Sequence, residues 1–245
     1  MLVALVVVGS AGGRAERAVQ TCKPGVHSLR LANGRPARMR VTAGDKGGKK
    51  ALVLALHGAG GSPDGGLYPF TAWNAPGIVL IAPASKGHTW SGLRGSDADL
   101  DSVNGALARA YERCPIDQRR IAVGGFSDGA TYALSIGLAS GDLFRSIMAF
   151  SPGGIVGDGQ AGRPRVFVAH GTRDRILPVS QANTVVWQPR SAGYSVTYRK
   201  FIGPRGPAQR LEGCPALVPL LDTARALVER DRARDRDVER LGVAR

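Results

Sequence analysis

The chain consists of apolar runs separated by segments rich in glycine, proline and polar residues. Each run has the length and the aliphatic, often β-branched composition of a strand. Several runs are continuously apolar and do not alternate with polar residues, which is typical of strands buried on both faces of a parallel sheet. The predicted strands are RMRVTA (38–43), ALVLALHGAGG (51–61), GIVLIAPAS (77–85), RIAVGGFSDG (120–129), FRSIMAFSPGG (144–154), RVFVAHGTRD (165–174) and YSVTYRKFIG (194–203).

Helix-like stretches lie between these runs, at Asp101 to Arg113, Thr131 to Leu138 and Pro178 to Ala192, the last interrupted at Pro189. Alternation of strands and helices predicts an α/β fold in one domain, with a mostly parallel central sheet and helices on both faces. In sheets of this kind, functional residues lie beyond the carboxyl ends of the strands.

The composition suits one well-buried domain, because the chain has 245 residues of which 43% are hydrophobic. The net charge of +14 is scattered along the chain. No basic stripe interleaved with aromatic residues is present, so a basic, solvated surface is favoured over a nucleic-acid partner.

The three cysteines, Cys22, Cys114 and Cys214, show no CxxC pairing and predict no metal site. A disulfide between Cys22 and Cys114 is one reading for an exported protein, and unpaired thiols are the other.

The first 20 residues resemble the apolar and cleavage regions of a signal peptide, although the usual positive region before them is missing. The apolar run is too short for stable insertion into a bilayer. This pattern favours export to the periplasm or the extracellular space, with a cytoplasmic protein as the alternative. The segment itself could instead be a first strand, or the remnant of a longer leader in which the start codon lies. The folded domain is expected to span residues 21–204.

A candidate nucleophile follows the strand 120–126. Gly125, Phe126, Ser127, Asp128 and Gly129 form a G-x-S-x-G pattern between that strand and an amphipathic helix. In this arrangement the serine occupies a strained turn, and the two glycines let strand and helix pass closely. The pattern predicts a nucleophile elbow with Ser127 exposed above the sheet; the alternative is a plain glycine turn.

Glycines also follow the strand that ends at His57. They free the backbone to aim N–H groups at a carbonyl oxygen that becomes negative during attack. The expected oxyanion hole consists of the N–H groups of Ala59 and of Asp128, the residue after the nucleophile. His57 is interpreted as packing the loop, with a role as base as the alternative.

A candidate acid, Asp174, lies in the loop after the strand 165–171. A carboxylate there can accept a hydrogen bond from an imidazole and stabilise its charged form. Asp174 follows Ser127 in the chain order serine, acid, histidine. His170, at the end of the same strand, is interpreted as structural.

Together HGAGG, GFSDGATYALS and HGTRDRILP resemble the α/β-hydrolase superfamily, in particular bacterial phospholipase/carboxylesterase-like and polyhydroxybutyrate-depolymerase-like or feruloyl-esterase-like serine esterases. The likeness runs from about residue 25 to residue 203. It implies an α/β-hydrolase domain, Ser127 as nucleophile, Asp174 as acid, an acyl-enzyme mechanism without cofactor or metal, and a small-molecule or polymeric ester as substrate.

The family's base histidine is missing. After the last strand the family pattern resembles F-D-G-P-H-x-V-P-P, and here Arg205 stands at the histidine position. All four histidines precede Asp174 in the chain. Arginine could pair with Asp174, but it stays protonated and cannot relay a proton. Within the segment HTWSGLRGSDADLDSV, expected to form a loop over the site, His88 is the one histidine that could substitute.

The tail 205–245 also departs from the family and is densely charged, which is typical of a solvated helix or a disordered tail. Residues 205–219 can be translated back into GC-rich codons, and the bases CA can be restored in front of them. Read in the shifted frame, this DNA can encode HAVPPSVSKAARRWF. This favours a frameshift over a natural arginine, and resequencing the gene across this codon distinguishes them. The expected function is a serine esterase impaired by Arg205. The alternatives are a non-catalytic binding protein of the same fold, a poorly folding product and a peptidase of the superfamily.

Overall fold

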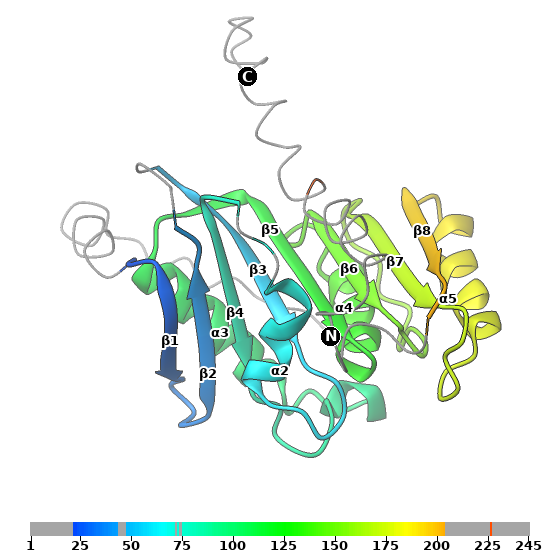
Figure 1. The fold of residues 1–245 in the computed structure, drawn as a ribbon, viewed down its shortest axis with the longest axis horizontal. Coiled ribbons are helices and arrows are strands. Elements are labelled where there is room, and N and C mark those ends of the chain that lie inside the picture. Colours follow the sequence, from blue (N-terminus) through cyan, green and yellow to red (C-terminus); the bar gives the residue numbers. More distant parts are fainter. Residues whose placement is uncertain (1–21, 44–47, 72, 74, 204–225, 227–245) are drawn as a thin grey trace, which may run out of the picture.

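The computed structural model describes residues 22–43, 48–71, 73, 75–203 and 226. Its centre is an eight-stranded sheet with the strand order β1-β2-β4-β3-β5-β6-β7-β8 (Figure 1). The pairs β1–β2 and β2–β4 are antiparallel, and all other pairs are parallel. The strands are β1 Gly25–Arg30, β2 Pro36–Val41, β3 Lys50–Leu56, β4 Ile78–Pro83, β5 Ile116–Phe126, β6 Ser146–Phe150, β7 Arg165–Gly171 and β8 Val196–Phe201.

Three helices fall between the strands as the sequence predicts, and a short fourth, α2, was not predicted. The helices are α2 Pro63–Leu67, α3 Leu100–Arg113, α4 Asp128–Ala139 and α5 Val179–Ser191, with short 3-10 turns η1 Tyr68–Phe70 and η2 Ser91–Arg94. One detail differs from the expectation, because α5 continues through Pro189 to Ser191. Pro189 lies in the last turn, where only one hydrogen bond is lost to its missing N–H.

Apolar side chains fill both faces of the sheet. On one face Val103 of α3, Tyr132 of α4 and Val185 of α5 pack against the strands. On the other face Phe70 and Trp73, which follow α2, complete a second cluster. Helices therefore cover both faces, as predicted, and β3 and β4 are buried along their whole lengths.

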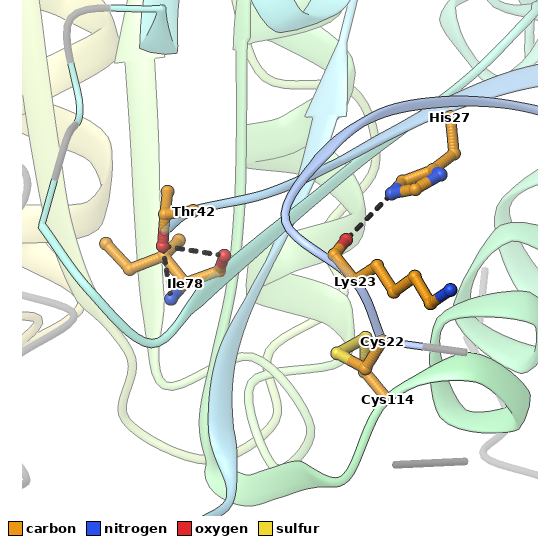
Figure 2. Close-up of a disulfide and its surroundings, with 6 residues drawn as sticks. All are labelled: Cys22, Lys23, His27, Thr42, Ile78 and Cys114. Carbon is orange, nitrogen blue, oxygen red and sulfur yellow. Dashed lines mark hydrogen bonds between the residues drawn. A yellow bond between two sulfur atoms is a disulfide. The ribbon is translucent and has the colours of Figure 1, made fainter. Parts of the chain in front are cut away.

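The antiparallel edge was not predicted in full. Strand β1 has the sequence GVHSLR, in which only Leu29 is buried, so its pattern carries little hydrophobic signal. Cys22, just before β1, forms a disulfide with Cys114 at the end of α3 (Figure 2). The disulfide fixes the entry to the edge strand and selects the paired alternative for these two cysteines.

Some predictions lie outside the described residues. These are the signal-like segment 1–20 and, apart from Ala226, the tail 205–245 with Arg205. Within the described part of the chain, no helix has the length and apolar character needed to cross a bilayer.

Candidate active site

Ser127 occupies the sharp turn between β5 and α4. Its backbone has φ 57° and ψ −122°, which non-glycine residues rarely adopt. The Ser127 N–H donates to the carbonyl of Phe150 at 2.9 Å, and the Ser127 carbonyl accepts from the Thr131 N–H at 3.0 Å. The turn is thus held by β6 on one side and by the first turn of α4 on the other.

The two glycines of the G-x-S-x-G pattern are required by the close passage of β3, β5 and α4. A Cβ atom at Gly125 would lie 2.5 Å from the carbonyl carbon of Gly129, and one at Gly129 would lie 2.2 Å from the carbonyl oxygen of Leu56. Side chains therefore cannot be accommodated at either position, and the turn has the steric character of the predicted nucleophile elbow.

The glycine loop after β3 passes directly beside Ser127. A Cβ atom at Gly58 would lie 3.3 Å from the Ser127 Cβ. Ala59 is exposed at the tip of this loop, and the N–H of the next residue, Gly60, donates to the carbonyl of His88 at 2.6 Å. Asp128 begins α4, where N–H groups have no acceptor within the helix. The two residues expected to form the oxyanion hole thus come from loops that meet at Ser127.

The His57 side chain is buried and contacts the glycine loop. Its Nδ1–H donates to the Gly58 carbonyl at 2.8 Å, and its Nε2 accepts from the Ser85 N–H at 3.1 Å. Burial lowers the pKa of the imidazole, although the Gly58 carbonyl opposes this shift. Both ring nitrogens of a buried, neutral imidazole are engaged, which agrees with packing and not with a role as base.

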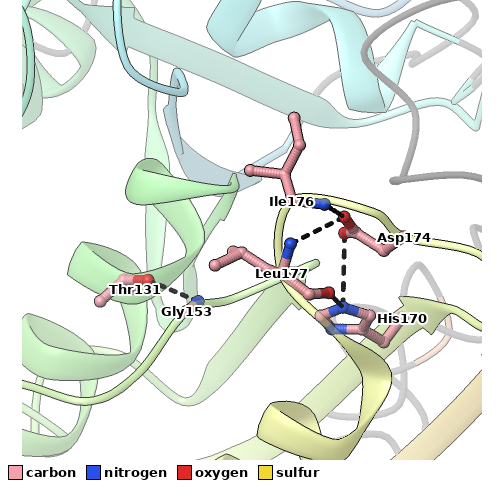
Figure 3. A network of polar contacts seen from close by, with 6 residues as sticks. All are labelled: Thr131, Gly153, His170, Asp174, Ile176 and Leu177. Carbon is pink, nitrogen blue, oxygen red and sulfur yellow. Dashed lines mark hydrogen bonds and ion pairs between the residues drawn. The ribbon is translucent and has the colours of Figure 1, made fainter.

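The acid loop after β7 is organised around the Asp174 carboxylate (Figure 3). Oδ1 accepts from the N–H groups of Ile176 and Leu177, both at 2.9 Å. Oδ2 lies 3.4 Å from Nε2 of His170, which is itself 2.8 Å from the Leu177 carbonyl. The side chains of Asp174 and His170 are both fully buried. His170 therefore supports the acid loop, in agreement with its structural interpretation.

The acid loop is also tied to the elbow. Thr131 of α4 accepts a hydrogen bond from the Gly153 N–H at 2.9 Å (Figure 3), and a Cβ atom at Gly153 would lie 3.4 Å from a methyl group of Leu177. Ser127 follows β5 and Asp174 follows β7, with β6 between them. Two strand spacings amount to about 10 Å, a gap that a bridging side chain of imidazole size can span.

None of the four histidines, all in the described part of the chain, comes from an element after Asp174. His57 and His170 are buried as stated, and His27 on the edge strand bonds to the Lys23 carbonyl at 2.8 Å (Figure 2). His88 lies in the loop after β4, and its ring is beside the glycine loop, since a Cβ atom at Gly60 would lie 2.9 Å from the His88 Cε1. The position of the missing base, Arg205, lies outside the described residues.

Two polar residues beside the site were missed by sequence reasoning. Thr89 donates to the Asp128 carboxylate at 2.6 Å, and the Asp99 carboxylate is buried in the loop that follows β4. The density of Ser, Thr and Asp in the segment 85–99 is a signal that could have drawn attention to them.

No family model matches the sequence, and no curated protein matches it. Solved structures do match. Esterase PE8 is 23% identical with a TM-score of 0.63, covering 82% of this chain and 99% of its own. Thermogutta terrifontis esterase 2, phosphorylated by paraoxon, is 16% identical with a TM-score of 0.65, covering 84% of this chain and 94% of its own. Pyrococcus horikoshii acylaminoacyl peptidase is 14% identical with a TM-score of 0.60, and this chain covers 41% of its length.

These likenesses concern the fold, since all three identities are below 25%. The mostly parallel eight-stranded sheet, the helices on its two faces and the esterase-like neighbours show that the chain has the α/β-hydrolase fold.

Proposed function

We propose that this chain, with its α/β-hydrolase fold, is a serine carboxylic ester hydrolase that works through an acyl-enzyme. The observation that carries the proposal is the backbone of Ser127, held at φ 57° between β5 and α4. Two residues away on either side, at Gly125 and Gly129, a Cβ atom would collide with backbone atoms. Backbone strain of this kind persists where the surrounding structure enforces it, and it is concentrated at functional sites. Structural neighbours that are esterases support the same class.

The residues take separate roles in the reaction. A base removes the proton from the Ser127 hydroxyl while its Oγ forms a bond to the ester carbonyl carbon. The carbonyl oxygen becomes negative and is stabilised by the N–H groups of Ala59 and Asp128. The intermediate then expels the alcohol, which takes the proton from the base, and water releases the acid from Ser127. Asp174 orients the base and stabilises its charged form. No metal or organic cofactor is needed for these steps.

This chain lacks a histidine at the position expected for the base. The proposal puts the base after β8, and it is supported by the hydrogen bond from the Arg173 N–H to the Gly203 carbonyl at 2.8 Å, one residue from Asp174. Arg205 follows Gly203 by two residues in the sequence. Since arginine cannot accept the proton, and loss of one triad member can cost up to about a millionfold in turnover, we expect the chain as it stands to be a slow esterase.

The test compares the full-length native chain with Arg205→His, Arg205→Lys and Ser127→Ala, using p-nitrophenyl acetate and butyrate. Arg205→His should raise kcat/KM by about 10²- to 10⁴-fold, the usual contribution of a general base. Arg205→Lys, which keeps the charge, should show no gain. Adding Ser127→Ala to Arg205→His should abolish the gain. If neither the native chain nor Arg205→His exceeds Ser127→Ala, the chain is not an esterase.

A non-catalytic binding protein is the second candidate, and Arg205 at the base position is the observation that favours it. In that case an arginine codon in an unbroken reading frame would accompany native turnover equal to that of Ser127→Ala. A shifted frame in the gene would instead support an active esterase as the ancestral product.

Export remains part of the proposal. The pairing of Cys22 with Cys114 supports it, because disulfides persist mainly in the periplasm and outside the cell. We propose a small-molecule or polymeric ester as the substrate.

A further inference from the structure

The loop that follows β4 reaches across a neighbouring strand to the nucleophile elbow. In the sheet, β3 lies between β4 and β5. Nevertheless Thr89 of this loop donates from its hydroxyl to the Asp128 carboxylate, after β5, at 2.6 Å. The carbonyl of His88, the preceding residue, accepts from the Gly60 N–H, after β3, at 2.6 Å. Two consecutive residues thus contact both loops that supply the oxyanion hole.

The loop is anchored by a buried carboxylate. Asp99 is completely buried, and its two oxygens accept from the N–H groups of Lys86 at 2.5 Å and Ser91 at 2.6 Å. The Asp99 N–H in turn donates to the Ser91 hydroxyl at 2.9 Å. Hydrogen bonds to an ionised group are among the stronger ones in proteins. They hold both ends of the segment that carries His88 and Thr89.

Trp90, the residue after Thr89, connects the same loop to the core. Its indole N–H donates to the His57 carbonyl at 2.8 Å, and its ring stacks on Tyr132 of α4 with centroids 5.3 Å apart. The segment 88–90 is therefore joined to the glycine loop, to the elbow and to the helix behind the elbow. These contacts place the segment 88–90 where it fixes the distance between the N–H groups of Ala59 and Asp128.

The orientation of the Asp128 carboxylate matters for the proposed oxyanion hole. The backbone N–H of Asp128 is one of the proposed donors, so the negative side chain belongs to the residue that must stabilise a negative oxygen. Asp128 is half-buried, and like charges repel more strongly near a protein surface than in bulk water. Thr89 directs this carboxylate toward the loop after β4, where the carboxylate accepts a hydrogen bond from the Thr89 hydroxyl.

We propose that Thr89 is a positioning residue of the oxyanion hole, acting through its hydrogen bond to Asp128 while His88 holds the glycine loop. This inference rests on the proposed esterase function. Loss of the Thr89 hydroxyl should leave substrate binding intact and weaken stabilisation of the transition state.

The experiment uses the native full-length chain and an alkyl fluorophosphonate, with adducts measured by intact-protein mass spectrometry at pH 9. The Ser127 Oγ forms a bond to phosphorus, fluoride leaves, and solvent takes the serine proton. Direct loss of one oxyanion donor costs about 10²- to 10³-fold. We expect a smaller loss, about 5- to 50-fold in the inactivation rate constant, for Thr89→Val, with the half-saturating concentration unchanged.

Matched variants separate positioning from folding. Thr89→Ser keeps the hydroxyl and should label at close to the native rate, whereas Thr89→Val keeps the volume and should be slow. In an Asp128→Ala background, Thr89→Val should have no further effect, because the hydrogen bond is already absent. Circular dichroism and the midpoint of urea unfolding verify that each variant is folded.

The outcomes distinguish the two proposals. Labelling of the native chain, slowed in Thr89→Val and restored in Thr89→Ser, supports the positioning role. Equal labelling rates in the native chain and Thr89→Val overturn it and leave the esterase proposal standing. No Ser127 adduct in the native chain or in Arg205→His overturns the esterase function, and the positioning role falls with it.

Discussion

The backbone N–H of Ser127 donates a hydrogen bond to the carbonyl of Phe150 at 2.9 Å, which fixes the turn at Ser127 to the neighbouring strand β6. This bond is formed although Ser127 has a positive φ of 57°. The sheet therefore enforces a backbone conformation that serine avoids, and the cost of that conformation can be measured.

Replacement of Ser127 by glycine should stabilise the protein relative to Ser127→Ala. Glycine adopts a positive φ without a Cβ penalty, and strained residues of this kind cost about 1–3 kcal/mol. Urea unfolding of the two variants measures the difference in free energy of unfolding. Neither variant should label with a fluorophosphonate. Equal stabilities would show that the turn is not strained.

Replacement of Gly129 by alanine should destabilise the fold severely. The new Cβ would lie 2.2 Å from the Leu56 carbonyl oxygen, and neither atom can move without its backbone, which belongs to α4 and β3 respectively. Overpacking usually costs about 1–3 kcal/mol and sometimes more, so we expect about 3 kcal/mol or more. Gly154→Ala is the matched control, since its Cβ meets nothing within 4 Å. Similar unfolding midpoints for the two variants would contradict the crowded junction.

Removal of the disulfide should lower the free energy of unfolding by about 2–5 kcal/mol, because the bond joins residues 92 positions apart and restricts the unfolded chain. The double variant Cys22→Ala/Cys114→Ala can be compared with the native chain in guanidinium, with and without reductant. Reductant should destabilise the native chain and leave the double variant unchanged. A native chain insensitive to reductant under unfolding conditions would contradict the bond.

Burial lowers the pKa of His57 from its ordinary value of 6.5. The unfolded chain therefore binds a proton at His57 more readily than the folded chain, so stability is lost as pH falls below about 6.5. The stability advantage of the native chain over His57→Gln should accordingly shrink from pH 7 to pH 5 in urea unfolding. An advantage that grows toward pH 5 would mean that the imidazole is charged in the folded state.

A second group does not interfere in that pH window. Burial is the largest single influence on the pKa of Asp117 and would raise it, but the hydrogen bonds from Arg120 and Arg119 together with the charges of both residues outweigh it, and the pKa is lowered from 3.8. The stability from Asp117 is thus present above about pH 4 and is lost only below it.

The central strands and the loops of the site were readable from the sequence because each signal is local. Continuous apolar runs marked β3 to β7, and the glycines at 125 and 129 marked a turn whose steric reason is visible in the fold. Ser127 and Asp174 lie after β5 and β7, where the rule that chemistry lies at the carboxyl ends of such strands puts candidate residues, and their roles stay predictions.

Other features could not be read because they depend on contacts between distant residues. Strand β1 is mostly exposed, and its pairing with β2 is what makes it a strand. The hydrogen bond from Thr89 to Asp128 joins residues 39 positions apart, and no local sequence pattern indicates it. The choice between paired and free cysteines likewise required the positions of Cys22 and Cys114 in space.

The pairing of Gly203 with Arg173 has a practical meaning for engineering. Strand β8 delivers the chain to the acid loop before the sequence departs from the expected pattern, so the framework that aims the hydroxyl is complete up to that point. Under the proposed function, restoring an esterase would require changes only at Arg205 and in the segment that follows it, with no redesign of the sheet.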